Sequence, residues 1–293
     1  MQACNLSFTP VESLLGGALI GVSATTLLVG YGRLLGFSGI LAQSTGPLLR
    51  ASFPELWRLM IVSGLILGGI ISSLLDSPSF SFPAPTLDYS LPTYAAAGAM
   101  AGFGTACGSG CTSGHGICGL GRLSPRSFVA VCTFLASAAA TSTLTIAKID
   151  GGCDNSAWLA PLALPGDLRA LLLGAGAPTA TTIGLFSLTY AVLRSHTHPL
   201  GKALVADRSN PRYADDLALL HALLALATGV TSGVGLVLGG MLDQNKVRGF
   251  LNLNGPWDPS LAMVMASGAT ISLAAHQFVA YHERVRSSPV RPA

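Results

Sequence analysis

Long apolar stretches recur along this chain and are separated by short polar connections. Seven of them approach or exceed the length that a helix needs to cross a bilayer, about 20 residues. They cover residues 13–32, 56–75, 93–111, 126–147, 168–193, 216–241 and 259–282. The pattern predicts an all-α, polytopic membrane helix bundle with about seven spanning helices. The first stretch lacks a basic leader region, so we expect it to be a retained span.

The composition agrees with a membrane protein. Of the 293 residues, 50% are hydrophobic and 10% are charged, whereas soluble domains carry about 25% charged residues. The apolar stretches are rich in Gly, Ala, Ser and Thr, which let membrane helices approach closely, so we expect a packed bundle in the lipid bilayer. The small net charge of +3 indicates no nucleic-acid partner.

Basic residues predict how the chain is oriented, because they gather on the cytoplasmic side. The connections 33–55 and 194–215 and the tail 284–293 carry Lys or Arg, while the connection between the second and third stretches carries none. Seven crossings place these three regions in the cytoplasm. We therefore expect a plasma (inner) membrane protein with its N-terminus outside and its C-terminus inside. Lys246 and Arg248 fall on the other side, and a re-entrant segment there would account for them.

The third apolar stretch runs into an interruption. Residues 102–126 read GFGTACGSGCTSGHGICGLGRLSPR. Glycine destabilises a helix by about 1 kcal/mol relative to alanine, and irregular backbone within a membrane persists only where protein or a cavity surrounds it. We predict that one helix ends near Gly110, that the next begins at Ser124-Pro125, and that a short re-entrant or broken segment joins them. Helix ends at this depth offer N–H groups that suit an anion.

The interruption contains three cysteines and a histidine. Cys107, Cys111, His115 and Cys118 are spaced by four, four and three residues, which would place them on one stripe of a continuous helix. The candidate substrate path comprises Cys111, Cys107, Cys118, His115, Gly110, Thr112, Ser113, Gly114 and Arg122. No catalytic residue, metal ligand or cofactor is assigned.

Each of these residues also has a simpler interpretation. Cys111 could be a small buried hydrophobe. His115 could be a ligand, a proton donor, or a structural residue that bridges backbone groups in a glycine loop. Arg122 could attract anions toward the path or anchor a helix end at the interface.

The glycine pattern of the interruption recurs later in the chain. Gly102, Gly104 and Gly108 match Gly233, Gly235 and Gly239 at a constant offset of 131 residues. Three spans separate the two segments, so the copies would be inverted, and inverted repeats with interrupted helices indicate a transport site near the bilayer midplane. We predict one membrane domain, 1–293, with halves 11–150 and 165–283 and a basic tail, 284–293. The alternative is chance similarity between glycine-rich membrane helices.

Two sets of motifs resemble a known family. The sequence GCTSGHGICGL at 110–120, followed by RLSPRS at 122–127, resembles the signature of the YeeE/YedE family of sulfur-transport membrane proteins. The motifs LVLGGM at 236–241, KVRGFL at 246–251 and WDPSLA at 257–262 resemble the small partner component found beside short YeeE-type proteins. The chain therefore resembles a fusion of a short YeeE-type half with that component.

The resemblance implies a non-enzymatic transporter or channel that takes up thiosulfate or a related sulfur-containing anion. It implies that Cys111, the cysteine of the motif, lines an hourglass-shaped path and passes the anion on by S–H···S contacts. A cytoplasmic sulfurtransferase that would accept the cargo is a candidate partner. Members with two full motifs carry a second cysteine, whereas the aligned residue here is Leu242.

The chemistry of thiosulfate fits this interpretation. It is a dianion with one soft sulfur, so it needs N–H donors for its charge and weak S–H donors for its sulfur. A thiolate would repel it, so we expect a neutral thiol, with a pKa raised by apolar surroundings. The alternatives are a metal or redox site built from Cys107, Cys111, His115 and Cys118, a sulfurtransferase that forms a persulfide on Cys111, and a transporter for another sulfur or selenium species.

Overall fold

The computed structural model describes residues 8–50, 56–74, 90–146, 175–184, 186–187, 211–253 and 257–287. Its helices are α1 Pro10–Tyr31, α2 Phe37–Arg50, α3 Leu56–Leu74, α4 Leu91–Cys107, the π-helix η3 Gly114–Gly119, α5 Pro125–Ile146, α7 Pro211–Leu238, α8 Gln244–Leu251 and α9 Ser260–Ser287. Residues 175–184 are also helical. Within these ranges the regular structure is helical throughout, which confirms the predicted all-α class.

Five helices in the described part of the chain are long and apolar enough to cross a membrane. They are Pro10–Tyr31, Trp57–Leu74, Pro125–Leu144, Leu219–Leu238 and Ser260–Tyr281. These helices fall in five of the seven predicted stretches and confirm an integral membrane helix bundle.

The two other predicted stretches behave differently. The third stretch forms α4, which is only 17 residues long because the glycine-rich interruption ends it at Cys107. Most of the predicted stretch 168–193, and most of the basic connection 194–215, lie outside the described residues. The predicted number of crossings and their direction therefore stay predictions.

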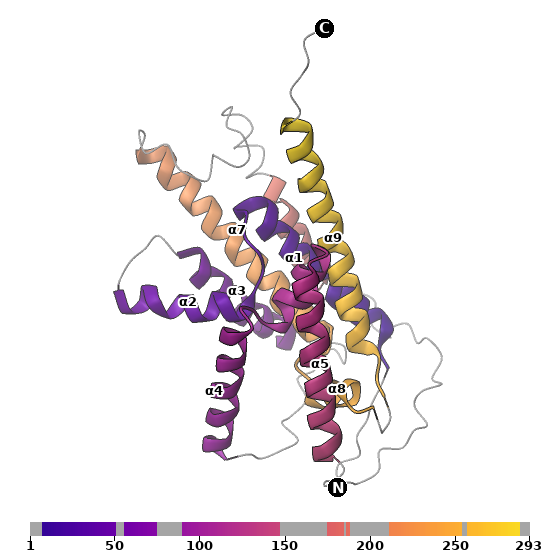
Figure 1. Cartoon of the computed structure of the whole chain (residues 1–293). Coiled ribbons are helices and arrows are strands. Elements are labelled where there is room, and N and C mark those ends of the chain that lie inside the picture. Colours follow the sequence, from indigo (N-terminus) through magenta and orange to yellow (C-terminus); the bar gives the residue numbers. More distant parts are fainter. Residues whose placement is uncertain are drawn as a thin grey trace.

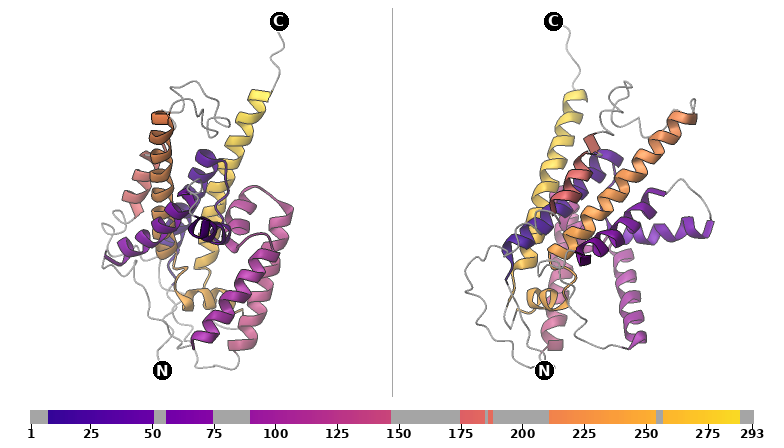
Figure 2. Two further views of the ribbon diagram at one scale, coloured as in Figure 1. Left: turned by 90° about the vertical axis from the view of Figure 1, so that its left-hand side faces the viewer. Right: turned by 180° about the vertical axis from the view of Figure 1, so that it is seen from behind.

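Four helices form the packed centre of the molecule. α7 packs against both α3 and α1, and α1 packs in turn against α9 (Figure 1). α4 buries none of its residues and projects away from these helices (Figure 2). The centre is therefore built from helices of both predicted halves.

Glycines bring these helices close together. Gly64 and Gly68 of α3 face Gly229 and Gly233 of α7, and a methyl group built on Gly68 would lie only 2.6 Å from the carbonyl oxygen of Val230. Such spacing of small residues lets helix backbones approach in lipid, where van der Waals packing drives association. The predicted close packing of the bundle is confirmed here.

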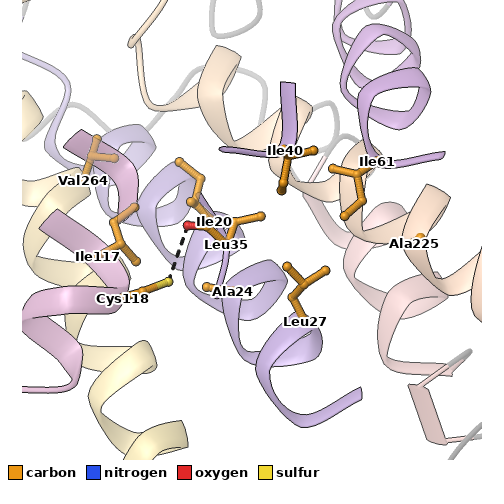
Figure 3. Packing of buried hydrophobic residues seen from close by; sticks show 10 residues of the cluster. All are labelled: Ile20, Ala24, Leu27, Leu35, Ile40, Ile61, Ile117, Cys118, Ala225 and Val264. Carbon is orange, nitrogen blue, oxygen red and sulfur yellow. Dashed lines mark hydrogen bonds between the residues drawn. The ribbon is translucent and has the colours of Figure 1, made fainter. Parts of the chain in front are cut away.

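A cluster of buried side chains connects the central helices to the interruption (Figure 3). Its members are Ile20, Ala24, Leu27, Leu35, Ile40, Ile61, Ile117, Cys118, Ala225 and Val264. Ile117 and Cys118 belong to η3 and are only 4% and 2% exposed. The interruption is therefore anchored in the core of the bundle.

Candidate functional site

The interruption begins with a defined turn. α4 ends at Cys107, and Ser109 adopts the left-handed conformation with φ of 57°. The N–H of Gly110 donates to the carbonyl of Thr105 at 3.0 Å, and that of Ser109 donates to Ala106 at 3.2 Å. This is the Schellman pattern, which satisfies carbonyls at a helix end. The end lies three residues before the predicted position near Gly110, and α5 begins at Pro125 as predicted.

Between these two helices the chain forms η3, which packs against α5, α9 and α1. Its glycines leave room for close neighbours: a methyl group on Gly116 would lie 3.1 Å from the terminal carbon of Met265, and one on Gly119 would overlap the hydroxyl of Ser127. π-helical turns are rare and often occur at functional sites. The predicted broken segment is thus a compact, tightly enclosed π-helix.

Cys111 lies in the turn before η3 and is half-buried. Its sulfur is 3.0 Å from the hydroxyl oxygen of Ser113. Burial alone would raise the pKa of this thiol, but hydrogen bonds from the Ser113 side chain, from the side chain and backbone of Ser38, and from the Gly114 backbone lower the pKa to about 7. The expectation of a raised pKa is wrong at Cys111, because hydroxyl and amide groups surround the sulfur.

Cys118 and Cys107 occupy contrasting environments. The Cys118 thiol is buried and donates to the carbonyl oxygen of Leu35 at 3.6 Å (Figure 3). Burial raises the pKa of Cys118, so this thiol is neutral at pH 7. Cys107 is exposed at the end of α4. The common stripe that a continuous helix would produce is absent among these cysteines, because the chain turns at Ser109, as the predicted break requires.

His115 forms hydrogen bonds with residues on both sides of the interruption. Its Nδ1 atom is 3.1 Å from the hydroxyl oxygen of Ser127, and its Nε2 atom is 3.3 Å from the carbonyl oxygen of Gly108. With the proton on Nε2, His115 donates to Gly108 and accepts from Ser127. A methyl group on Gly110 would lie 2.7 Å from Nε2. These contacts favour the structural interpretation of His115.

The other candidate residues surround Cys111 in the chain. Gly110, Ser113 and Gly114 are partly buried, whereas Thr112 and Arg122 are exposed. Ser38 and Ser127 contact the candidate residues but were not predicted as site residues. Ser127 stands in the family motif, whereas Ser38 lies in the first turn of α2, and no local pattern marks it.

The alternative metal site is not formed by the four residues proposed for it. Across the described residues, no three His, Cys, Asp or Glu side chains come together in an arrangement that could hold a metal ion. Cys107 is exposed, Cys118 bonds to Leu35, and His115 bonds to Ser127. These side chains have separate partners and do not converge.

The second glycine segment ends its helix in the same way as the first. Gly240 is left-handed with φ of 68°, and its N–H donates to Val237 at 3.0 Å while that of Met241 donates to Leu236 at 3.1 Å. Each of these residues lies 131 positions after its counterpart at the end of α4. The short helix α8 follows and packs against α5 and α9, two of the helices that also contact η3.

The second interruption, between the end of α7 at Leu238 and the start of α9 at Ser260, contains charged side chains. Lys246 follows Gly240 by six residues, as His115 follows Ser109, and its ammonium donates to the hydroxyl of Thr9. Asp258 is 5% exposed, and its Oδ1 atom accepts from the N–H of Ser260 at 2.9 Å. Its Oδ2 atom is buried without a hydrogen-bond partner among the described residues. Lys246 and Arg248 lie on the short helix α8, and the re-entrant segment expected there stays a prediction.

A glycine-packed bundle with a cysteine-bearing interruption between two of its helices has the architecture of a membrane transporter. A family model described as sulphur transport matches residues 2–140, and a family of unknown function, DUF6691, matches residues 220–291. Probable transporters from Xylella fastidiosa strains Temecula1 and 9a5c are each 43% identical over 130 residues, which is 44% of this chain and 90% of the relative. The chain belongs to the YeeE/YedE-type sulphur transport family. No solved structure matches it.

Proposed function

We propose that this transporter takes up thiosulfate, or a closely related sulfur anion, along a path that passes Cys111. The observation that carries the proposal is the set of polar groups around this thiol: Ser113 lies 3.0 Å from the sulfur, and Ser38 and Gly114 also bond to it. Hydroxyl and amide donors suit the oxygens of thiosulfate, and the thiol suits its terminal sulfur. Both kinds of donor occur together at Cys111.

The protonation of Cys111 is coupled to the charge of the substrate. A pKa of about 7 means that thiol and thiolate are both populated near neutral pH. A dianion beside the sulfur disfavours the charged thiolate and therefore raises the pKa of Cys111 when it binds. The substrate thus selects the neutral thiol, which can donate a hydrogen bond to it.

The neighbouring residues have distinct roles in this proposal. Thr112, Ser113 and the backbone at Gly110 and Gly114 supply polar groups around the anion. His115 holds the interruption in shape through its bonds to Gly108, just after α4, and to Ser127 of α5. Further path positions comprise exposed Cys107, buried Cys118 and exposed Arg122, whose charge attracts anions.

The two predicted halves, 11–150 and 165–283, are retained as inverted copies. The matching hydrogen bonds at the ends of α4 and α7 support the repeat, and the separate family models matched by residues 2–140 and 220–291 support the division into two halves. We keep the prediction of a plasma-membrane protein with its N-terminus outside and its C-terminus inside, and we propose that transport runs inward. A cytoplasmic sulfurtransferase then accepts the sulfur.

Uptake of radiolabelled thiosulfate by liposomes containing the purified protein tests the proposed substrate. Empty liposomes measure the background, and unlabelled sulfate, sulfite and selenite compete with the tracer. Sulfate has the same charge and shape but lacks the terminal sulfur, so we expect it to compete at least about tenfold less well than thiosulfate. Equal competition by sulfate would show that the terminal sulfur is not recognised.

The lowered pKa of Cys111 favours a second candidate, a sulfurtransferase activity at the same residue. The Cys111 thiolate would attack the terminal sulfur of thiosulfate, form an S–S bond, and release sulfite as the S–S bond of the substrate breaks. Mass spectrometry after exposure to thiosulfate would then show one added sulfur atom on Cys111, with an equal amount of sulfite in solution. An unmodified Cys111 in protein that transports thiosulfate would exclude this candidate.

A further inference from the structure

The helix α9 brings a histidine close to the cysteine-bearing interruption. Ser272 of α9 packs on Gly121, since a methyl group built on that glycine would lie 2.6 Å from the Ser272 hydroxyl oxygen. The same hydroxyl bonds to the sulfur of Cys118. His276 follows Ser272 by one helical turn, and its Nδ1 atom is 3.4 Å from that hydroxyl oxygen. A helix of the second half thus contributes an imidazole to the surroundings of the first interruption.

A hydrogen bond to the backbone fixes the tautomer of His276. Its Nδ1 atom lies 2.8 Å from the carbonyl oxygen of Ser272, and a carbonyl only accepts, so Nδ1 carries the hydrogen. In the neutral ring, Nε2 is then a bare acceptor. This atom is buried and has no hydrogen-bond partner in the described part of the chain. Buried polar atoms are nearly always paired in native proteins, so Nε2 requires a hydrogen that these residues do not supply.

A proton is the partner that this position favours. His276 lies within the apolar span Ser260–Tyr281, and ionisable residues in such spans are rare and mark proton or substrate pathways. Histidine changes its charge near neutral pH, and a proton requires only the one bare ring nitrogen. A metal ion would need further ligands, and no cluster of His, Cys, Asp or Glu within the described ranges provides them.

The charged groups around α9 determine when the ring can hold a proton. Among the described elements, α1, η3 and α8 pack against α9. Their charged or titratable side chains are Glu12 and Tyr31 of α1, His115 and Cys118 of η3, and Lys246 and Arg248 of α8. The N–H of Thr9 donates to Ser260, and that of Asp258 donates to Gly249. The start of α1 and all of α8 therefore lie at the start of α9, at the opposite end from His276.

The charge closest to this part of α9 is positive. Arg122 follows η3, and its charge acts on Cys118, the thiol that Ser272 contacts. A positive charge there disfavours a protonated imidazole, whereas an anion between the two groups would favour it. His282 and Glu283 follow His276 along α9, and their side chains lie outside the described residues. The described surroundings of His276 thus make its protonation depend on a bound anion.

Proton and anion binding then support each other. A protonated Nε2 donates to an oxyanion, and an anion stabilises the protonated ring, so each increases the affinity for the other by the same factor. The membrane potential, negative inside, opposes the entry of thiosulfate in proportion to the charge that is moved. A proton that accompanies the dianion halves this net charge. Coupling to a proton therefore also makes uptake easier.

We propose that His276 is the proton-binding residue of this transporter and that a proton crosses the membrane together with each anion. The proton comes from water on the outer side, binds Nε2 while the anion is present, and returns to water on the cytoplasmic side. This inference rests on the proposed function, because it assigns the coupling ion of that same path.

Liposomes that contain the purified protein and an entrapped pH indicator test the coupling. Labelled thiosulfate is added outside, and potassium with valinomycin holds the membrane potential at zero, so uptake and acidification of the interior are recorded together. The test variant is His276→Gln. The matched control is His221→Gln, because His221 also has a buried Nε2 atom without a partner among the described residues. Thermal unfolding checks that each variant folds.

We expect wild type and His221→Gln to move about one proton per thiosulfate, and His276→Gln to take up thiosulfate with at least about tenfold less acidification per anion. Cys111 is intact in His276→Gln, so unchanged acidification there would assign the proton to another group and overturn the proposal. Uptake without acidification in wild type would overturn the coupling alone. No uptake by wild type would overturn the proposed function and the coupling with it.

A measurement on the ring itself needs no variant. The C2 hydrogen of histidine exchanges with deuterium through the protonated ring, so mass spectrometry of peptides reports how far His276 is protonated. At about pH 7, thiosulfate should raise the exchange rate of His276 at least about threefold and leave that of His221 unchanged. An unchanged rate at His276 would mean that water or lipid covers a neutral ring, and would overturn the proposal. The same result decides the case of a folded His276→Gln variant that takes up no thiosulfate.

Discussion

The two interruptions have the same helix ending but different side chains. At the end of α4 and at the end of α7, a left-handed residue closes the helix with the same pair of hydrogen bonds. The first interruption then presents Cys111 and His115, whereas the second presents Leu242 and Lys246 at the aligned positions. One contains a thiol and an imidazole, and the other an apolar side chain and an ammonium group.

This comparison separates what the backbone does from what the side chains do. Glycine spacing and the left-handed residue determine where the helix stops and how its carbonyls are satisfied. The residues presented after the turn determine which ligand could be bound there. A thiol suits a soft sulfur atom, whereas an ammonium suits any small anion, so we expect the first interruption to select for sulfur and the second to contribute charge.

Exchanging the aligned residues Cys111 and Leu242 should give the largest effect, which is on thiosulfate uptake. Cys111→Leu should abolish thiosulfate uptake into liposomes, because the thiol is lost, whereas Leu242→Cys should keep uptake within about twofold. The double exchange should not restore transport, since the contacts of Cys111 with Ser113 and Ser38 stay in the first interruption. Restored uptake in the double variant would mean that the two interruptions are chemically interchangeable.

Removing His115 tests whether it supports the first interruption or acts on the anion. His115→Ala leaves the carbonyl of Gly108 and the hydroxyl of Ser127 without their present partner, which should lower the free energy of unfolding by about 1–3 kcal/mol. Denaturant unfolding of the purified protein measures this, with Ser127→Ala as a partner variant expected to reproduce part of the loss. A His115→Ala protein with normal stability but no uptake would place His115 in contact with the substrate instead.

The pH dependence of maleimide labelling should distinguish Cys111 from the buried thiol Cys118. Because hydrogen bonds lower its pKa to about 7, the thiolate fraction rises with pH, and maleimide labelling of Cys111 should increase about tenfold between pH 6 and pH 8. Thiosulfate uptake should fall over the same interval, since the thiolate repels the dianion. Cys118 should stay unlabelled, because burial raises its pKa.

This measurement is made with Cys4, Cys107, Cys132 and Cys153 replaced by Ala, so that their labelling does not obscure the result. A flat labelling profile between pH 6 and pH 8 would contradict the hydrogen-bonded environment of Cys111.

Exchanging the left-handed residues Ser109 and Gly240 should give the smallest effect, which is on the free energy of unfolding. Gly240→Ser places a side chain in the left-handed region, which costs about 1–2 kcal/mol, and its Cβ atom would lie 2.7 Å from the Cδ atom of Lys246. Ser109→Gly should change stability by less than about 1 kcal/mol, because glycine adopts this conformation without strain. Denaturant unfolding of both variants measures the difference, and equal effects would contradict the proposed equivalence of the two turns.

The sequence predicted the elements that depend on local pattern. Five of the apolar stretches, the broken helix before Pro125 and the close packing of glycine-rich helices follow from hydrophobicity and from glycine and proline positions. Cys107 and Cys118 would share a stripe only on a continuous helix, and the turn at Ser109 separates them.

Contacts between distant segments could not be predicted in this way. Ser38 lies 73 residues before Cys111 in the sequence, and nothing in its own segment marks it as a partner. The direction of the Cys111 pKa shift depends on that contact and on the contact with Ser113, so it was also predicted incorrectly.

The most direct test of the central claim is uptake of sulfur-labelled thiosulfate by cells that lack their own thiosulfate importers. Wild-type protein and Cys111→Ala are compared at matched membrane expression, with Leu242→Ala as the control from the second interruption. The account predicts uptake by wild type and by Leu242→Ala, and loss of uptake in Cys111→Ala. Equal uptake by all three proteins would contradict a path that depends on Cys111.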